Sequence, residues 1–279
     1  MKTSSLLILF ILFLPATIKA QYSRVRFQVV DKFTEIDTAR YIVTYSSEVI
    51  VDTIEAGKKT DELCLEIGKR ISKIYSLPTY KADSVSTDLM RKSIDNIVNS
   101  PGTTPQVIYK NYPDGKVTVI NRSITNLFKY EEDYPIAFKW KLLPEKKVIL
   151  NYTCQRAETT FRGRTYTAWF TPEIPLKEGP AKFGGLPGLI LELSDSQNHY
   201  NYICIGIEKP KTTTPIVYWS WKCTNTSREK YLDLSKKMHE KPLTYQRATG
   251  TGGMNFISPD GKITSAPDKP YPYNPMERE

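Results

Sequence analysis

Apolar and polar side chains alternate with a period of two in the first part of the chain, which predicts strands. Residues 41–45 are rich in β-branched and aromatic side chains, and Leu63, Leu65 and Ile67 alternate with polar neighbours. The alternation places Cys64 on the polar side of its strand. We therefore expect a sheet that begins here.

The same period recurs along the middle of the chain and predicts consecutive hairpins. Residues 107–109 and 117–120 flank Pro113-Asp114-Gly115, whose residue types favour a tight turn. The other predicted segments are strands at 71–75 and 136–142, a turn at 144–147, strands at 148–154 and 165–170, a loop at 172–180, a hairpin of 189–193 with 200–207, and a strand at 216–221. Consecutive hairpins imply an antiparallel sheet.

Two segments show helical spacing instead. Apolar residues recur every three or four positions within residues 84–98, which predicts an amphipathic helix with Ser84 or Ser86 as its N-cap. Residues 100–102 contain Pro and Gly and are expected to end it. Residues 227–240 repeat the helical pattern.

These patterns predict a mainly β (α+β) fold, with a single antiparallel, curved or half-barrel-like sheet and one or two amphipathic helices. We expect one domain over residues 21–258. Residues 259–279 are rich in Pro, Gly and charge, so we expect a flexible C-terminal tail. A membrane barrel fits poorly, because a helix, a Pro-rich loop and a charged C-terminus interrupt the strands.

The first twenty residues have the three-part layout of a secretory signal peptide. Lys2 gives a positive start, residues 6–14 are apolar, and small and polar residues lead to Ala20, after which we expect cleavage. The apolar run is too short for a membrane helix, and no later segment is long and apolar enough. We therefore expect an exported protein of the periplasm or cell envelope, without a membrane span once the signal is removed.

The chain contains the four cysteines Cys64, Cys154, Cys204 and Cys223. An oxidising compartment permits disulfides among them, and sequence alone does not choose among the three possible pairings. Buried free thiols are the alternative, because a free Cys packs like a small hydrophobic residue. There is no C-x-x-C pair, which argues against a zinc ribbon or a thioredoxin-type centre.

The most distinctive segment reads Gly-Leu-Pro-Gly-Leu-Ile over residues 185–190. Pro187 presets φ at the second position of a type II turn, and Gly188 supplies the positive φ of the third. Gly184 and Gly185 permit a close backbone approach or an unusual conformation. The segment is thus interpreted as a tight corner that leads into a central strand.

A ligand or partner site at this corner is the other interpretation, because Trp169 and Phe183 could form an apolar platform beside the exposed backbone. The candidate contact residues are Trp169, Phe183, Gly185, Leu186, Pro187 and Gly188. Turn and core demands explain the same residue types, so the sequence favours the structural interpretation.

Residues 154–193 carry this motif together with Trp169-Phe170-Thr171 and Gly179-Pro180. The stretch resembles the GLPGLI family, exported envelope proteins found mostly in Bacteroidota. Residues 67–76 resemble the family more weakly. The resemblance implies an exported protein and gives no reaction, because the family has no assigned activity.

The sequence contains no recognisable catalytic or cofactor motif. His199 and His239 lack partners at metal-ligand spacing, and no Gly-x-Ser-x-Gly elbow is present. Residues 250–253 are Gly-rich but lack the Lys-Ser/Thr of a phosphate loop. The acidic run at residues 131–133 is expected to lie in a solvated loop. We expect no metal and no cofactor.

Together, these features favour a non-enzymatic envelope protein that binds an envelope partner or an apolar ligand. The net charge of +9 comes from scattered basic residues, which argues against nucleic-acid binding. An exported hydrolase with carboxylate or His residues dispersed along the chain is the alternative. An apolar groove would support binding, whereas a polar cleft with paired carboxylates would support catalysis.

Overall fold

The computed structural model describes residues 27–54, 57–94, 96–100, 102–123, 126–248, 255–257, 263–265 and 268–278. The predicted signal peptide and the Gly-rich residues 250–253 lie outside these ranges. The helices of the described part are α1 (Leu77–Arg91), α2 (Arg228–Glu240) and α3 (Pro242–Ala248).

The described part is otherwise built mainly from strands. They are β1 (Phe33–Thr38), β2 (Tyr41–Ile50), β3 (Lys58–Ile67), β4 (Ser72–Ser76), β5 (Gln106–Lys110), β6 (Lys116–Arg122), β7 (Leu127–Asp133), β8 (Lys141–Ile149), β9 (Tyr152–Phe161), β10 (Arg164–Thr171), β11 (Leu189–Asp195), β12 (Tyr200–Glu208), β13 (Pro215–Trp219), β14 (Thr224–Asn225), β15 (Asn255–Ile257) and β16 (Ile263–Ser265).

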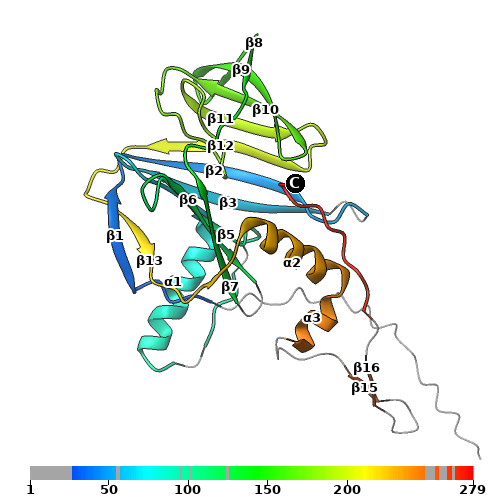
Figure 1. Cartoon of the computed structure of the whole chain (residues 1–279). Coiled ribbons are helices and arrows are strands. Elements are labelled where there is room, and N and C mark those ends of the chain that lie inside the picture. Colours follow the sequence, from blue (N-terminus) through cyan, green and yellow to red (C-terminus); the bar gives the residue numbers. More distant parts are fainter. Residues whose placement is uncertain are drawn as a thin grey trace, which may run out of the picture.

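Twelve of the strands form one open, curved sheet in the order β14-β7-β6-β5-β4-β3-β2-β12-β11-β10-β9-β8 (Figure 1). Neighbouring strands run antiparallel, except that β14 runs parallel to β7. Two small pairs, β1 with β13 and β15 with β16, complete the strands. The predicted fold class is therefore confirmed, and β14 and β8 are the edges of the sheet.

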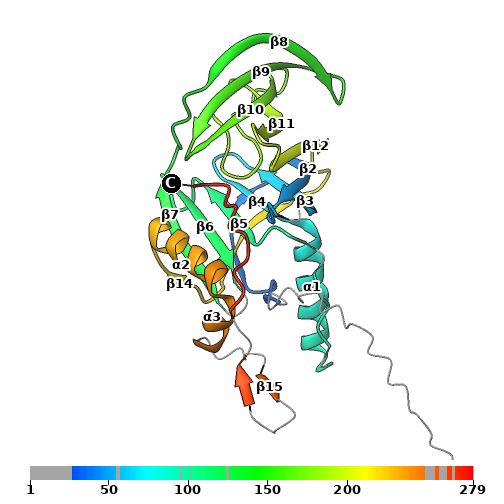
Figure 2. The ribbon, with the colours of Figure 1, turned by 90° about the vertical axis from the view of Figure 1, so that its right-hand side faces the viewer.

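Strands β3 to β7 are covered on both faces, which explains why β5 and β6 are buried almost throughout. On one face Tyr231 of α2 packs against Tyr130 of β7, with ring centroids 5.9 Å apart. On the other face Tyr80 of α1 packs against Tyr75 of β4 and Trp219 of β13, with ring centroids 5.5 and 5.7 Å away. Figure 2 shows α1 and α2 on opposite sides of these strands.

This two-sided cover corrects the prediction for Cys64. The residue does alternate with Leu63 and Leu65, but it is buried on the face that α1 and β13 cover. Alternation identifies two faces of a strand, and it indicates solvent only where nothing packs on the second face.

The predicted helix at 84–98 exists as α1, but it begins and ends seven residues earlier, at Leu77 and Arg91, so residues 100–102 do not end it. Its N-cap is Ser76, whose hydroxyl accepts an N–H of the first turn at 3.2 Å. The helix exposes Val85 and buries Asp83, which pairs with Arg122 of β6. The apolar spacing thus did not mark the buried side, because a buried ion pair lies there instead.

The predicted strands and turn between residues 136 and 154 are shifted. Residues 136–140 lie outside any strand, and β8 runs through the predicted turn at 144–147. The hairpin turn falls at Leu150 and Asn151, which both have positive φ. Strand β8 is an edge strand, so Pro144 is tolerated at the register irregularity between Leu142 and Lys146.

The other predicted elements are confirmed within a few residues. The predicted strand at 71–75 is β4, the hairpin around residues 113–115 joins β5 to β6, and the strand at 165–170 is β10. The predicted hairpin of residues 189–193 with 200–207 is β11 with β12. The helix predicted at 227–240 is α2.

Candidate functional site

Phe183 and Leu186 lie in the core, with 0% and 1% of their surface exposed. The Phe183 ring packs against Tyr166 and Phe138, with centroids 4.6 and 5.1 Å away. Trp169 is half-buried elsewhere on β10, 4.5 Å below the Lys147 ammonium. The structure therefore does not bring Phe183 and Trp169 together as one exposed platform.

The Gly-Leu-Pro-Gly-Leu-Ile segment forms a corner, but its turn differs from the predicted type II turn. Gly185, not Gly188, has positive φ, at +83°. Gly188 is required for space, because a Cβ there would lie 2.0 Å from the Thr171 carbonyl oxygen. A Cβ on Gly184 would lie 2.6 Å from the Lys177 carbonyl oxygen, and the Gly184 carbonyl accepts a 2.9 Å hydrogen bond from Trp140 Nε1. The motif therefore fixes the loop onto β10 and leads into β11.

A cavity of about 280 Å³ lies away from this corner, between the sheet, α2 and the C-terminal residues. None of the six candidate contact residues lines it. Its lining is mostly apolar and comes from β2, β3, β4, β5, β12 and α2, including Val49, Leu63, Ile74, Ile108 and Leu232. The volume lies just under the range of about 300–1,000 Å³ that is usual for small-molecule sites. The concave face of the sheet thus holds the best-formed cavity among the described residues.

Tyrosine hydroxyls are part of the polar lining of the cavity, together with charged and amide side chains such as Lys59, Glu277 and Gln106. Tyr202 on β12 and Tyr231 on α2 both line it, and no hydrogen bond joins either hydroxyl to the described residues. Burial raises the pKa values of Tyr231 and Tyr202 well above the usual value of 10, so both remain neutral hydroxyls. These groups can orient a bound molecule through one or two hydrogen bonds without placing a charge beside it.

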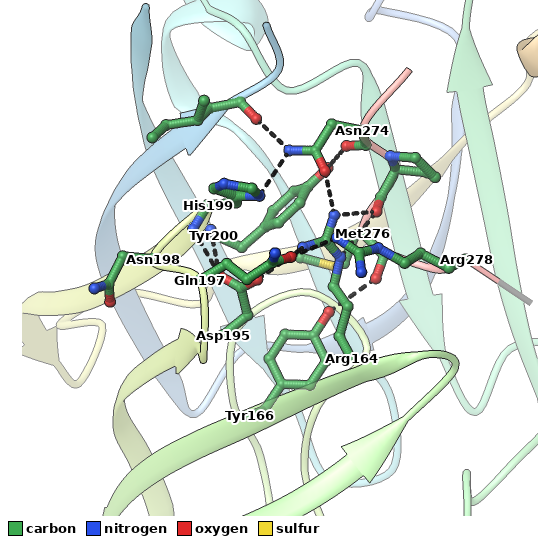
Figure 3. A network of polar contacts seen from close by, with 12 residues as sticks. Arg164, Tyr166, Asp195, Gln197, Asn198, His199, Tyr200, Asn274, Met276 and Arg278 are labelled. Carbon is green, nitrogen blue, oxygen red and sulfur yellow. Dashed lines mark hydrogen bonds and ion pairs between the residues drawn. The ribbon is translucent and has the colours of Figure 1, made fainter. Parts of the chain in front are cut away.

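Residues 273–278, which we call the C-terminal strap, close one side of the cavity. Composition predicted a flexible segment here, but residues 273–277 line the cavity, and Asn274 and Glu277 are only 9% exposed. Figure 2 shows the strap running between α2 and the sheet. Three side chains of the sheet, Arg164, Tyr166 and Tyr200, hold it in place (Figure 3).

An ion cluster anchors the far end of the strap. Glu277 pairs with Lys182 at 2.8 Å, with Arg228 at 2.7 Å and with Arg162. Glu132 of β7 also pairs with Arg162 and Lys182. Burial alone would raise the pKa of Glu277, but the charges of Lys182 and Arg162 outweigh burial and lower it to about 2. The Glu277 carboxylate is therefore ionised throughout the physiological range. The predicted solvated acidic run at 131–133 thus includes one mostly buried side chain, that of Glu132, which is 11% exposed.

All four cysteines are free thiols in the structure. Burial raises the pKa of Cys64 and Cys154 to about 11 and that of Cys204 to about 12. At neutral pH these three thiols are protonated, and a protonated thiol is a poor nucleophile and metal ligand. The free-thiol alternative from the sequence thus describes the cysteines as the structure has them.

Within the described ranges, no cluster of three or more His, Cys, Asp or Glu side chains could hold a metal ion. Over the same residues, no helix has the length and apolar character needed to cross a bilayer. The two histidines make separate contacts. His239 Nδ1 lies 2.7 Å from the Ser235 carbonyl oxygen, and His199 Nδ1 lies 3.2 Å from the Asn274 side-chain amide.

Residues 159–192 match the sequence profile of a family described as "Protein of unknown function (Porph_ging)", which is associated with Bacteroidota. The match lies within the stretch that resembles the GLPGLI family. The GLPGLI assignment itself stays a prediction. No curated protein matches the chain.

Two solved structures, of PNGF-II in space groups P21 and C2, have a similar arrangement of elements. Each is 15% identical in sequence, with a TM-score of 0.47. The similarity covers 73% of this chain and 34% of the PNGF-II chain, so this chain spans about a third of that protein.

Proposed function

We propose that the protein is an exported envelope protein that binds an apolar ligand, without catalysis, in the cavity between the sheet and α2. One observation carries the proposal: a mostly apolar cavity of about 280 Å³ opens on the concave face of the sheet and presents neutral tyrosine hydroxyls. Apolar walls with a few placed polar groups are typical of sites that bind small molecules. The signal-like N-terminus and the resemblance to envelope proteins support the location.

The hydrolase alternative has less support from the lining of the cavity. Among the described residues, Glu277 is the only carboxylate that lines it. Its low pKa and its three cationic partners keep it ionised and fully engaged. A general acid or base needs a pKa near the working pH and access to the substrate. The first condition fails for Glu277, and although it lines the cavity its carboxylate is already paired with cations.

The test fills the cavity from the α2 side. Ser235 lines the cavity, whereas its neighbour Lys236 is exposed, so Ser235→Trp and Lys236→Trp introduce the same side chain into opposite environments. The neutral fluorescent probe N-phenyl-1-naphthylamine should bind the wild type saturably. We expect Ser235→Trp to weaken binding about tenfold or more, and Lys236→Trp to preserve it.

Two results would contradict the proposal: no saturable binding by the folded wild type, or equal binding by both Trp variants. The location is checked separately by fractionating cells of the native host and measuring the mass of the protein. A mature chain that begins at Gln21 is expected, and a cytosolic chain that retains Met1 would contradict export.

A further inference from the structure

The strap is held mainly through its backbone carbonyl oxygens. Tyr200 Oη donates to the carbonyl of Asn274 at 2.6 Å, and Tyr166 Oη donates to that of Met276 at 2.8 Å. Arg164 donates from Nε and Nη2 to the carbonyl of Pro275, at 3.0 and 2.8 Å. These three side chains, which we call the backbone clamp, thus hold three consecutive carbonyls of an extended segment (Figure 3).

The backbone clamp is also tied to the sheet by contacts that do not involve the strap. Arg164 Nη1 pairs with Asp195 at 2.7 Å, and both side chains are 1% exposed with the strap in place. Asp195 also accepts the backbone N–H groups of residues 199 and 200 at 2.7 and 2.9 Å, which fixes the β11–β12 turn. The arginine is therefore preorganised by the sheet, and its remaining N–H groups point to the strap.

Two strap side chains are recognised in addition to the backbone. The Asn274 amide accepts from Arg164 at 2.5 Å and donates to the carbonyl of Ile50 at 2.6 Å. Three residues later, the Glu277 carboxylate lies among Arg162, Lys182 and Arg228, which we call the cation cluster. The surface thus selects an extended segment with an Asn and, three positions on, an acidic residue.

The charge balance of the cation cluster restricts what can replace the strap. With Glu277 in place, the three cations face Glu132, Glu277 and the exposed Glu229, and Arg228 Nη2 already lacks a partner among the described residues. Without Glu277 they keep Glu132 and, 3.9 Å from Arg228, the exposed Glu229, although their own side chains are only between 4% and 22% exposed. Buried cations left unpaired are costly, so the strap leaves readily only if another carboxylate takes its place.

From these contacts we infer that the backbone clamp and the cation cluster form a peptide-binding site, and that the strap is its intramolecular ligand. The site accepts in exchange an extended, acidic segment of a partner protein with the Asn-x-x-Glu spacing of residues 274–277. The side chains that make the recognition belong to the sheet, the β9–β10 turn, the loop before β11 and α2, so none of them leaves with the strap. Exchange also opens the cavity, because residues 273–277 form one of its walls. Only that consequence rests on the proposed function.

The experiment uses the full chain with a protease site inserted in the Gly-rich residues 250–253, cleaved after folding. A fluorescent synthetic peptide with the sequence of residues 268–279 is then equilibrated in excess with cut and uncut protein, and its anisotropy is measured. We expect saturable binding to the cut protein. The apparent affinity for the uncut protein should be lower by about tenfold or more, because its strap competes at a high effective concentration.

Peptide variants separate specific recognition from general attraction. Glu277→Gln and Asn274→Ala should each weaken binding about tenfold or more, because each leaves buried partners unsatisfied. Lys269→Gln changes the charge by one unit in the opposite direction at an exposed position and should have little effect. Equal binding of all the peptides would overturn the inference, as would cut protein that remains folded by circular dichroism yet binds no better than uncut protein.

A second arm leaves the chain intact in case cutting unfolds it. Glu277→Gln in the uncut protein weakens the intramolecular ligand and leaves the site unchanged. The wild-type peptide should then bind about tenfold more tightly than it binds uncut wild type. An unchanged affinity would overturn the inference. Probe binding in the cavity is not part of either measurement, so failure of the proposed function would be seen separately.

Discussion

Substitutions at two glycines of the Gly-Leu-Pro-Gly-Leu-Ile segment distinguish a left-handed turn from a close contact. Gly185 has φ of +83° with open space at its Cβ position, whereas Gly188 has its Cβ position filled by the Thr171 backbone. Asn tolerates positive φ better than Ala does, but it is larger. The order of Ala and Asn in stability should therefore reverse between the two sites.

The magnitudes follow from the distances. A Cβ on Gly188 would lie 2.0 Å from the Thr171 carbonyl oxygen and 2.6 Å from its carbon, so the two strands must separate by about 1 Å to reach 3.0 Å. Thr171 is 0% exposed and pairs with Leu189 in the sheet, so it has little freedom to move. We expect Gly188→Ala to cost about 3 kcal/mol, the upper end for overpacking, and Gly188→Asn to cost more. At Gly185, Ala should cost about 1–2 kcal/mol, and Asn less.

The free energy of unfolding is measured by urea titration for the four variants, with Gly57→Ala as the control. No atom lies within 4 Å of a Cβ on Gly57, so this change should stay within about 0.5 kcal/mol of the wild type. A Gly188→Asn protein more stable than Gly188→Ala would show that residue 188 needs positive φ. That result would restore the type II turn and refute the close-contact explanation.

Two further predictions concern stability against pH. The pKa of Glu277 falls from 4.5 to about 2 on folding, so its contribution is complete above pH 4.5 and is lost as the pH drops toward 2. This contribution amounts to about 3 kcal/mol. The difference in free energy of unfolding between the wild type and Glu277→Gln, measured by urea titration, should shrink over that pH window, and a constant difference would contradict this. Burial lowers the pKa of Lys73, which lies 3.5 Å over the Trp219 ring, to about 8. Above pH 8 the unfolded chain then holds more protons than the folded protein, so the free energy of unfolding of the wild type should rise from pH 8 to 9. Lys73→Met should lack this rise, and identical pH profiles for the two proteins would contradict the prediction.

Most of the sheet could be predicted from the sequence because hairpin strands are specified locally. The strands around residues 113–115 and the pair β11 with β12 have alternating side chains and turn residues within a few positions of each other. The errors occur where tertiary contacts override the local pattern. Helix α1 buries Asp83 because Arg122, far along the chain, pairs with it.

The candidate site could not be predicted because its parts are distant in sequence. Arg164 and Asn274 are 110 positions apart, and Lys182 and Glu277 come from a loop and the strap. The proline and charged residues of 259–279 predicted flexibility. A segment held through its backbone carbonyl oxygens needs no periodic apolar side chains, so the hydrophobic pattern could not reveal it. The one available signal was the aromatic content of the tail, with Tyr271 and Tyr273 close together.

The position of the cavity follows from the dimensions of the sheet and its cover. Twelve strands spaced about 4.8 Å apart form a sheet on the order of 50 Å wide, even before curvature is considered. Helix α2 has 13 residues and is therefore only about 20 Å long, too short to cover that concave face. The strap covers part of the remainder, but as a single extended segment it cannot fill the depth that a helix fills. The space left between α2, the strap and the curved strands is the cavity, so its size depends on a segment held chiefly by polar contacts and open to exchange.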